Sequence, residues 1–194
     1  DAYRLENQYQ TAIQHYEKAL EIGREQGYKL EETDAYLGLE HAYEKAMKIA
    51  KQVGEKCQEH RSNEAIANIP TIAGSYDKTR QYYEKAVETA MELGDKYSEG
   101  NSRLSLASVC IKDCDYEMAK NEYEKVLSFL GTDPNHDLLC EKALAGLGVA
   151  FFNLGDIEMA VENVEKAKTF GRKETKTEIH NVENKLENPN ATDQ

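Results

Sequence analysis

The fold of this chain is decided by a short motif, Tyr16-Glu17-Lys18-Ala19, that recurs four more times. The other copies are Tyr43-Glu44-Lys45-Ala46, Tyr83-Glu84-Lys85-Ala86, Tyr123-Glu124-Lys125-Val126 and Val164-Glu165-Lys166-Ala167. The first residues of successive copies are 27, 40, 40 and 41 residues apart. Three of the four intervals therefore agree on a repeat of about 40 residues, a period that indicates a helical repeat protein.

Residues before the motif also repeat, and their offsets predict a helix with one buried face. An apolar residue recurs seven positions before the motif, at Tyr9, Tyr76, Tyr116 and Ile157. A small residue recurs four positions before the motif, at Ala12, Thr79, Ala119 and Ala160. Offsets of three and four residues place these groups on one side of a helix. A turn former stands nine positions before the motif at Asn7, Gly74 and Gly155. The fourth repeat has Cys114 there, and because cysteine is poorly suited to a left-handed backbone, we expect its turn to differ.

A glycine follows the motif at a constant offset, at Gly27, Gly54 and Gly94, and each is followed two residues later by lysine. This pattern indicates a helix end and a new helix start. The sequence therefore predicts an all-α fold, an α-solenoid of antiparallel helix pairs. Its array covers residues 1–170, with units at about 1–26, 27–53, 54–93, 94–131 and 132–170.

The second unit is 13 residues shorter than the others, and its central turn is missing. We expect one fused helix near residues 31–53, with a heptad-like apolar stripe at Ala35, Leu39, Ala42, Tyr43, Ala46, Ile49 and Val53. The stripe has two interpretations. It either packs against neighbouring helices of the same chain, or it forms a self-association seam that includes Ala35, Leu39, Ala42, Ala46, Ile49 and Val53 and makes a homodimer.

Other breaks in the pattern fall at the ends and in the third unit. The first unit should hold the end of a first helix near Tyr3, and a second helix after Asn7. In the third unit, Pro70 should stop the first helix near Ile69, because proline lacks an amide hydrogen and clashes with the preceding turn. Residues 171–187 are expected to form a capping helix, and residues 188–194 a disordered tail.

These residues resemble the tetratricopeptide repeat family. The matching positions are Leu147-Gly148 with Phe151, Gly155, Ala160 and Ala167, and Leu106-Ala107 with Cys110, Ala119, Tyr123 and Val126. The 40-residue units look most like the LGN/Pins-type scaffold proteins. The resemblance implies a protein-binding adaptor. The clamp with which chaperone-binding members hold a terminal carboxylate is missing, because Ser105, Ser108, Gly146 and Val149 occupy its positions.

Composition restricts the kinds of partner. The formal net charge is −12, and no Lys/Arg cluster forms a basic surface for nucleic acid or an anionic membrane. The charge favours a basic or mixed peptide as partner, unless it only keeps the helix faces soluble. Four cysteines in 194 residues do not suggest a disulfide framework, and we expect a cytoplasmic protein.

No residue pattern predicts catalysis. The five histidines lie in different parts of the chain, and neither a phosphate-binding loop nor a Cys-His arrangement is present. We expect no enzyme activity, no catalytic residues, no metal site and no cofactor.

The predicted function is that of a signalling scaffold or adaptor that binds a peptide segment of a partner protein on its concave face. First helices line that face in such arrays, so the groove candidates are Arg61, Asn68, Asn101, Leu104, Ser105, Ser108, Lys112, Lys142, Val149 and Asn153. The alternative for these residues is that they are only exposed helix positions. The alternative function is a structural, self-associating segment without a peptide ligand.

Overall fold

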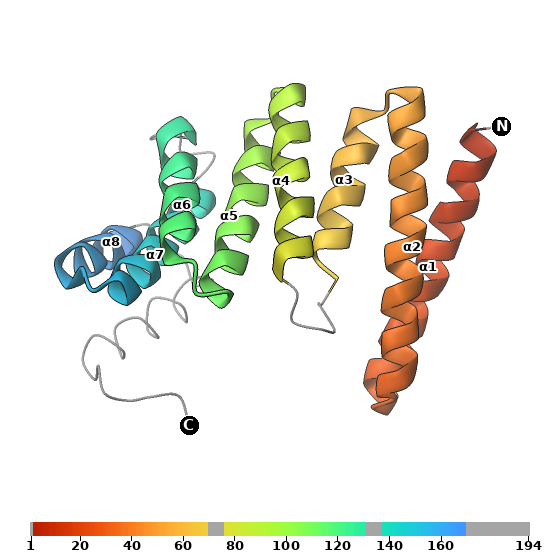
Figure 1. Cartoon of the computed structure of the whole chain (residues 1–194), viewed down its shortest axis with the longest axis horizontal. Helices are drawn as coiled ribbons and strands as arrows, with labels where there is room; N and C mark the ends of the chain where they lie inside the picture. Colours follow the sequence, from red (N-terminus) through yellow and green to blue (C-terminus); the bar gives the residue numbers. More distant parts are fainter. Residues whose placement is uncertain (1, 70–75, 131–136, 170–194) are drawn as a thin grey trace. The chain divides into compact units, whose positions relative to one another are not determined.

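The computed structural model describes residues 2–69, 76–130 and 137–169. Their regular structure is entirely helical, which confirms the predicted all-α class (Figure 1). The helices are α1 Ala2–Gln26, α2 Lys29–Val53, α3 Lys56–Ala67, α4 Tyr76–Leu93, α5 Lys96–Lys112, α6 Tyr116–Leu130, α7 Asp137–Leu154 and α8 Ile157–Thr169. The expected capping helix 171–187 and the tail 188–194 lie outside the described residues.

The chain forms two compact units, Asp1–Asp95 and Lys96–Gln194. The first contains α1 to α4 and the second contains α5 to α8. Neighbouring helices in each unit pack against each other, α1 on α2, α2 on α3 and α3 on α4, and then α5 on α6, α6 on α7 and α7 on α8. In the second unit α5 also contacts α7.

The first unit begins with a hairpin of two 25-residue helices. The fused helix is present as α2, because no residue between Lys29 and Val53 interrupts the helical hydrogen bonds. The turn expected at Asn7 is absent, and this expectation was wrong. The backbone stays helical through Asn7, whose carbonyl accepts a hydrogen bond from Thr11 Oγ1 at 2.9 Å. Asparagine tolerates a turn but does not enforce one, and neither glycine nor proline adjoins it.

Side-chain contacts fix the direction in which the helices of the first unit run. Tyr82 Oη on α4 donates to Glu44 Oε1 on α2 at 2.8 Å, and Lys78 pairs with Glu40 one turn earlier on both helices. The constant offset of 38 residues between these pairs makes α4 parallel to α2. Helix α1 is antiparallel to α2, because Tyr43 Oη donates to Glu17 Oε1 and Arg24 binds Tyr36 Oη.

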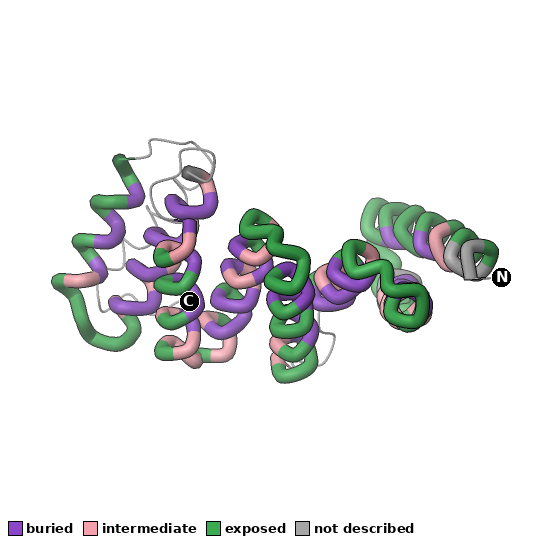
Figure 2. Tube along the Cα trace, turned by 90° about the horizontal axis from the view of Figure 1, so that it is seen from above, coloured by how far each residue is buried: buried purple, intermediate pink, exposed green. Residues whose placement is uncertain are grey.

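The repeated motif places small side chains where helices meet. Ala46, Ala86, Val126 and Ala167, the fourth residues of four motif copies, are at most 1% exposed. Buried and exposed residues recur along the helices in Figure 2, as expected for amphipathic helices with one covered side. The tyrosine of the motif reaches the next helix. The ring of Tyr123 lies so close to Gly146 that it fills the space of a β-carbon, and Tyr16 contacts Gly38 in the same way.

The turns that follow α1, α2, α4, α5 and α7 share one backbone conformation. Gly27, Gly54, Gly94 and Gly155 have φ values of 70°, 77°, 67° and 86°. Cys114 has a φ of 60°, so its backbone lies in the same left-handed region. The expectation that its turn differs was wrong. The hydrogen bonds explain why, since Asp115 N–H donates to Cys110 O at 2.9 Å, as Asp156 N–H donates to Phe151 O at 3.0 Å.

Candidate functional site

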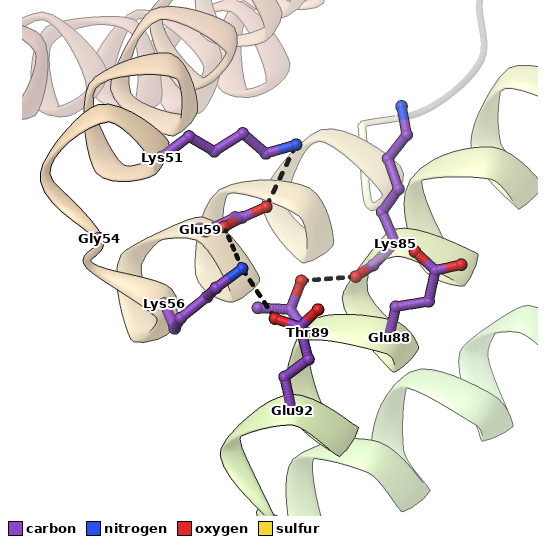
Figure 3. Close-up of a pocket in the computed structure, with 8 residues that line it drawn as sticks. All are labelled: Lys51, Gly54, Lys56, Glu59, Lys85, Glu88, Thr89 and Glu92. Carbon is purple, nitrogen blue, oxygen red and sulfur yellow. Dashed lines mark hydrogen bonds and ion pairs between the residues drawn. The ribbon is translucent and has the colours of Figure 1, made fainter.

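A cavity of about 350 Å³ opens in the first unit where α2 ends, α3 begins and α4 passes beside them. Its lining is mostly charged and consists of Lys51, Gly54, Lys56, Glu59, Lys85, Glu88, Thr89 and Glu92. Three lysines face three glutamates, so the lining carries no net charge on a chain whose formal net charge is −12. Figure 3 shows Lys51 and Lys56 converging on Glu59.

Glu59 is the central group of this cavity. Its carboxylate is buried, and it pairs with Lys51 Nζ at 3.2 Å and Lys56 Nζ at 3.3 Å. Lys56 Nζ also lies 2.7 Å from Glu92 Oε2 on α4, and this hydrogen bond is the main reason why the pKa of Lys56 is raised. The left-handed turn at Gly54 permits this arrangement, because it brings the end of α2 and the start of α3 to the same place.

The α4 wall of the cavity is held by local contacts. Thr89 Oγ1 donates to the Lys85 carbonyl at 2.7 Å, and Lys85 Nζ lies 4.9 Å from the centre of the Tyr82 ring. Burial, followed by the hydrogen bond to Glu44, raises the pKa of Tyr82 above its ordinary value. The tyrosine therefore stays neutral at physiological pH and continues to donate to Glu44. Such a lining can pair with charges on a ligand, but it presents no activated nucleophile.

The predicted groove residues of the second unit lie on α5 and α7. Asn101, Ser108 and Lys112 are exposed along α5, and Ser105 between them is half-buried. Leu104 is 7% exposed and belongs to the core, so it is not available to a ligand's side chains in this conformation. The accessible stripe on α5 is therefore polar.

The stripe on α7 contains the other three candidates of the second unit. Lys142 and Val149 are half-buried and Asn153 is exposed. Val149 packs against a core cluster that includes Ala145 and Val164, and its carbonyl accepts a hydrogen bond from Asn153 Nδ2 at 2.8 Å. Helix α5 contacts α7 in the second unit, so the two helices that carry these stripes are neighbours.

The candidates on α3 belong to the first unit. Arg61 is exposed on α3, and Asn68 lies directly after its end. Asn68 Oδ1 accepts a hydrogen bond of 2.6 Å from Tyr83 Oη, which ties the end of α3 to α4.

Most of the predicted self-association residues are buried inside the single chain. Ala35, Leu39, Ala42, Ala46 and Ile49 are 1% to 9% exposed, whereas Val53 is 48% exposed. Ala35, Leu39 and Ala42 form one cluster with Ile13 and Leu20 of α1. This part of the stripe therefore packs on α1, and a second copy could use it only after α1 had moved away.

The charged cavity was not predicted from the sequence. Gly54-Glu55-Lys56 was recognised only as a turn, and nothing in the spacing showed that Lys51 and Glu92 converge on this turn. Within residues 2–69, 76–130 and 137–169, His, Cys, Asp and Glu side chains form no group of three or more that could hold a metal ion. Over the same ranges, none of the helices has the length and apolar character needed to span a bilayer.

Comparison with known proteins supports the predicted repeat type. A family model described as tetratricopeptide repeat matches residues 1–25 and 141–170. This match and the helix pairs support a repeat protein of the tetratricopeptide type. Such repeats generally mediate protein–protein interactions and are typically not enzymes. The LGN/Pins-type resemblance stays a prediction.

Two further comparisons add little to this identification. No curated protein sequence matches the chain significantly. Among solved structures, the crystal structure of BtubC (BKLC) from P. vanneervenii matches with 12% sequence identity and a TM-score of 0.46. The match covers 88% of this chain and 91% of the other.

Proposed function

We propose that the chain is a binding scaffold that holds a peptide segment of a partner protein on the paired stripes of α5 and α7. The observation that supports this most directly is the contact between the two helices. Helix α5 carries Asn101, Ser105, Ser108 and Lys112, and the helix that it contacts carries Lys142, Val149 and Asn153. Amide and hydroxyl groups can bond to the backbone of an extended peptide, and Val149 offers it an apolar contact.

Charge on this surface narrows the choice between a basic and a mixed partner. The accessible groove candidates on α5 and α7 include Lys112 and Lys142 and no carboxylate, although the chain as a whole is acidic. A purely basic segment would meet two ammonium groups here. A segment of mixed charge fits better, because its acidic residues can approach the lysines and its basic residues are attracted by the net charge of −12 on the chain.

Photo-crosslinking tests this surface directly. We expect a photoreactive residue at Ser105 or Ser108 to crosslink one defined protein from a native extract. The double variant Lys112→Glu/Lys142→Glu should reduce that crosslink about tenfold or more, because it replaces attraction by repulsion. The matched control is Lys166→Glu on α8, whose ammonium group pairs with Glu162 on the same exposed helix face. Equal crosslinking by both variants would show that the peptide lies elsewhere.

The second function, self-association, would take a specific form. Because Ala35, Leu39 and Ala42 pack on α1, two copies would have to exchange α1 to use this part of the stripe. Sedimentation velocity across a range of protein concentrations distinguishes the two functions. A dimer that persists on dilution would favour exchange, and a monomer would favour the scaffold.

A further inference from the structure

Helix α3 lies between α2 and α4, and most of its buried residues are polar (Figure 1). Only the last two are apolar in the buried set Glu59, His60, Ser62, Asn63, Ile66 and Ala67. Helix α5, its counterpart in the next repeat, buries Leu104, Leu106 and Val109 and a single polar side chain, Ser102. Burial of apolar surface is the main force that holds helices together, and it therefore holds α3 less firmly than α5.

Two neighbouring side chains of α3 are buried without hydrogen-bond partners. Ser62 and Asn63 are 0% exposed. Within the described residues, Ser62 Oγ and both polar atoms of the Asn63 amide, Oδ1 and Nδ2, form no hydrogen bond. A polar group that is buried without a partner destabilises the state in which it is buried, because water would bond to it once it was exposed. Ser62 and Asn63 therefore oppose the packing of α3 on its neighbours.

The next repeat shows how such a position can instead stabilise the packing. Asn63 lies 40 residues before Arg103, so the two occupy equivalent positions on α3 and α5. Arg103 binds Glu122 of α6 at 2.6 Å, which ties α5 to the helix that follows it. The Asn63 amide makes no such bond to α4 within the described part of the chain. The contacts that join α3 and the residue after it to α4 include Lys56 Nζ–Glu92 Oε2 at 2.7 Å, His60 Nδ1–Ala86 O at 2.9 Å and Tyr83 Oη–Asn68 Oδ1 at 2.6 Å.

The two helices that flank α3 are also joined to each other directly. Tyr82 Oη on α4 donates to Glu44 Oε1 on α2 at 2.8 Å, and Lys78 pairs with Glu40 one turn earlier. These contacts use no group of α3. Helices α2 and α4 can therefore stay connected when α3 moves.

We propose that α3 is a releasable helix, which leaves its place between α2 and α4 at a lower free energy than that at which either flanking helix unfolds. Its polar buried face weakens its packing, and the unpaired atoms of Ser62 and Asn63 bond to water on release. Release also abolishes the charged cavity, because α3 supplies Lys56 and Glu59 to its lining. A ligand in this cavity therefore stabilises the docked position of α3.

Hydrogen exchange on the full chain near neutral pH tests the release. We expect the amides of α3 to exchange at least about tenfold faster than those of α2 and α4, after correction for intrinsic rates. Amides in the first turn of each helix are left out of the comparison, because they have no helical acceptor. Exchange in α3 that is as slow as in α2 and α4 would overturn the proposal.

Substitutions that remove the unpaired atoms test the cause. Ser62→Ala deletes the hydroxyl, and Asn63→Leu replaces the amide with an apolar group of similar size, so each should slow exchange in α3 several-fold. The matched control is Asn163→Leu on α8. Asn163 is 4% exposed, but its Nδ2 donates to Met159 O at 2.8 Å, so its replacement should not slow exchange in α8. If neither Ser62→Ala nor Asn63→Leu slows exchange in α3, the proposal is wrong.

Discussion

At the scale of single residues, the turns show how backbone conformation limits the choice of side chain. Four turns of this type use glycine, and the fifth has Cys114 with a φ of 60°. A left-handed backbone costs a residue with a β-carbon on the order of 1–3 kcal/mol. A hydrogen bond between the Cys114 thiol and Tyr116 compensates for part of this cost. The same bond raises the pKa of the Tyr116 phenol.

Replacing Cys114 by glycine should therefore stabilise the second unit by about 1 kcal/mol, which is the relief of strain less the extra freedom of the unfolded chain. Urea unfolding monitored by circular dichroism measures this change. Gly155→Ala is the reverse control and should destabilise by a similar amount. A β-carbon at Gly155 would have nothing within 4 Å, so only its backbone at φ 86° would be strained. A lower midpoint for Cys114→Gly would show that the bond to Tyr116 outweighs the strain.

At the scale of helices, the α1–α2 hairpin shows which parts of the fold are encoded locally. The fused helix could be predicted because the missing turn and the apolar stripe are both visible within one segment. The partner of that stripe could not be predicted, because the same pattern fits a neighbouring helix or a second copy. Leu104 illustrates the same limit. Its place on a first helix was clear, but the rotation that buries it depends on α6 and α7.

The buried stripe on α2 can be tested with two leucines that lie two residues apart. Leu39 is 5% exposed and Leu37 is 55% exposed. Leu39→Glu should destabilise the chain by about 3 kcal/mol or more, because it buries an unpaired carboxylate. Leu37→Glu should change stability by less than about 0.5 kcal/mol. Thermal unfolding gives both values. If Leu39→Glu instead separates a dimer into folded monomers, the stripe is an interface between copies.

At the scale of the whole molecule, each compact unit has its own buried polar contacts. The clearest example in the second unit joins α5 to α6, where Arg103 Nη1 lies 2.6 Å from Glu122 Oε2. The side chains of Arg103 and Glu122 are 12% and 7% exposed. Arg103 also pairs with Glu99 at 2.8 Å, and Lys125 pairs with Glu122. The sequence did not predict this network, because its members come from different helices.

Removing the carboxylate of Glu122 should destabilise the second unit selectively. Glu122→Ala leaves a largely buried guanidinium short of a partner, and such a loss costs about 3 kcal/mol. Hydrogen exchange should then accelerate within residues 96–130 and 137–169 and change little within α1 to α4. Glu162→Ala removes an exposed ion pair with Lys166 and should cost less than about 0.5 kcal/mol. An equal acceleration in both units would mean that the chain unfolds as one cooperative body.

The fused helix has a consequence for chain polarity. In an array of complete helix pairs, every helix that carries the Tyr-Glu-Lys motif runs in the same direction. Here α2 runs parallel to α4, but α1 runs antiparallel to α2, so the motif on α1 points opposite to the motifs on α2 and α4. Because one turn is missing, the first unit contains motif-bearing helices that run in opposite directions. A ligand whose backbone runs in one direction cannot meet α1 and α4 in equivalent orientations, so repeat-by-repeat recognition must stop at α2.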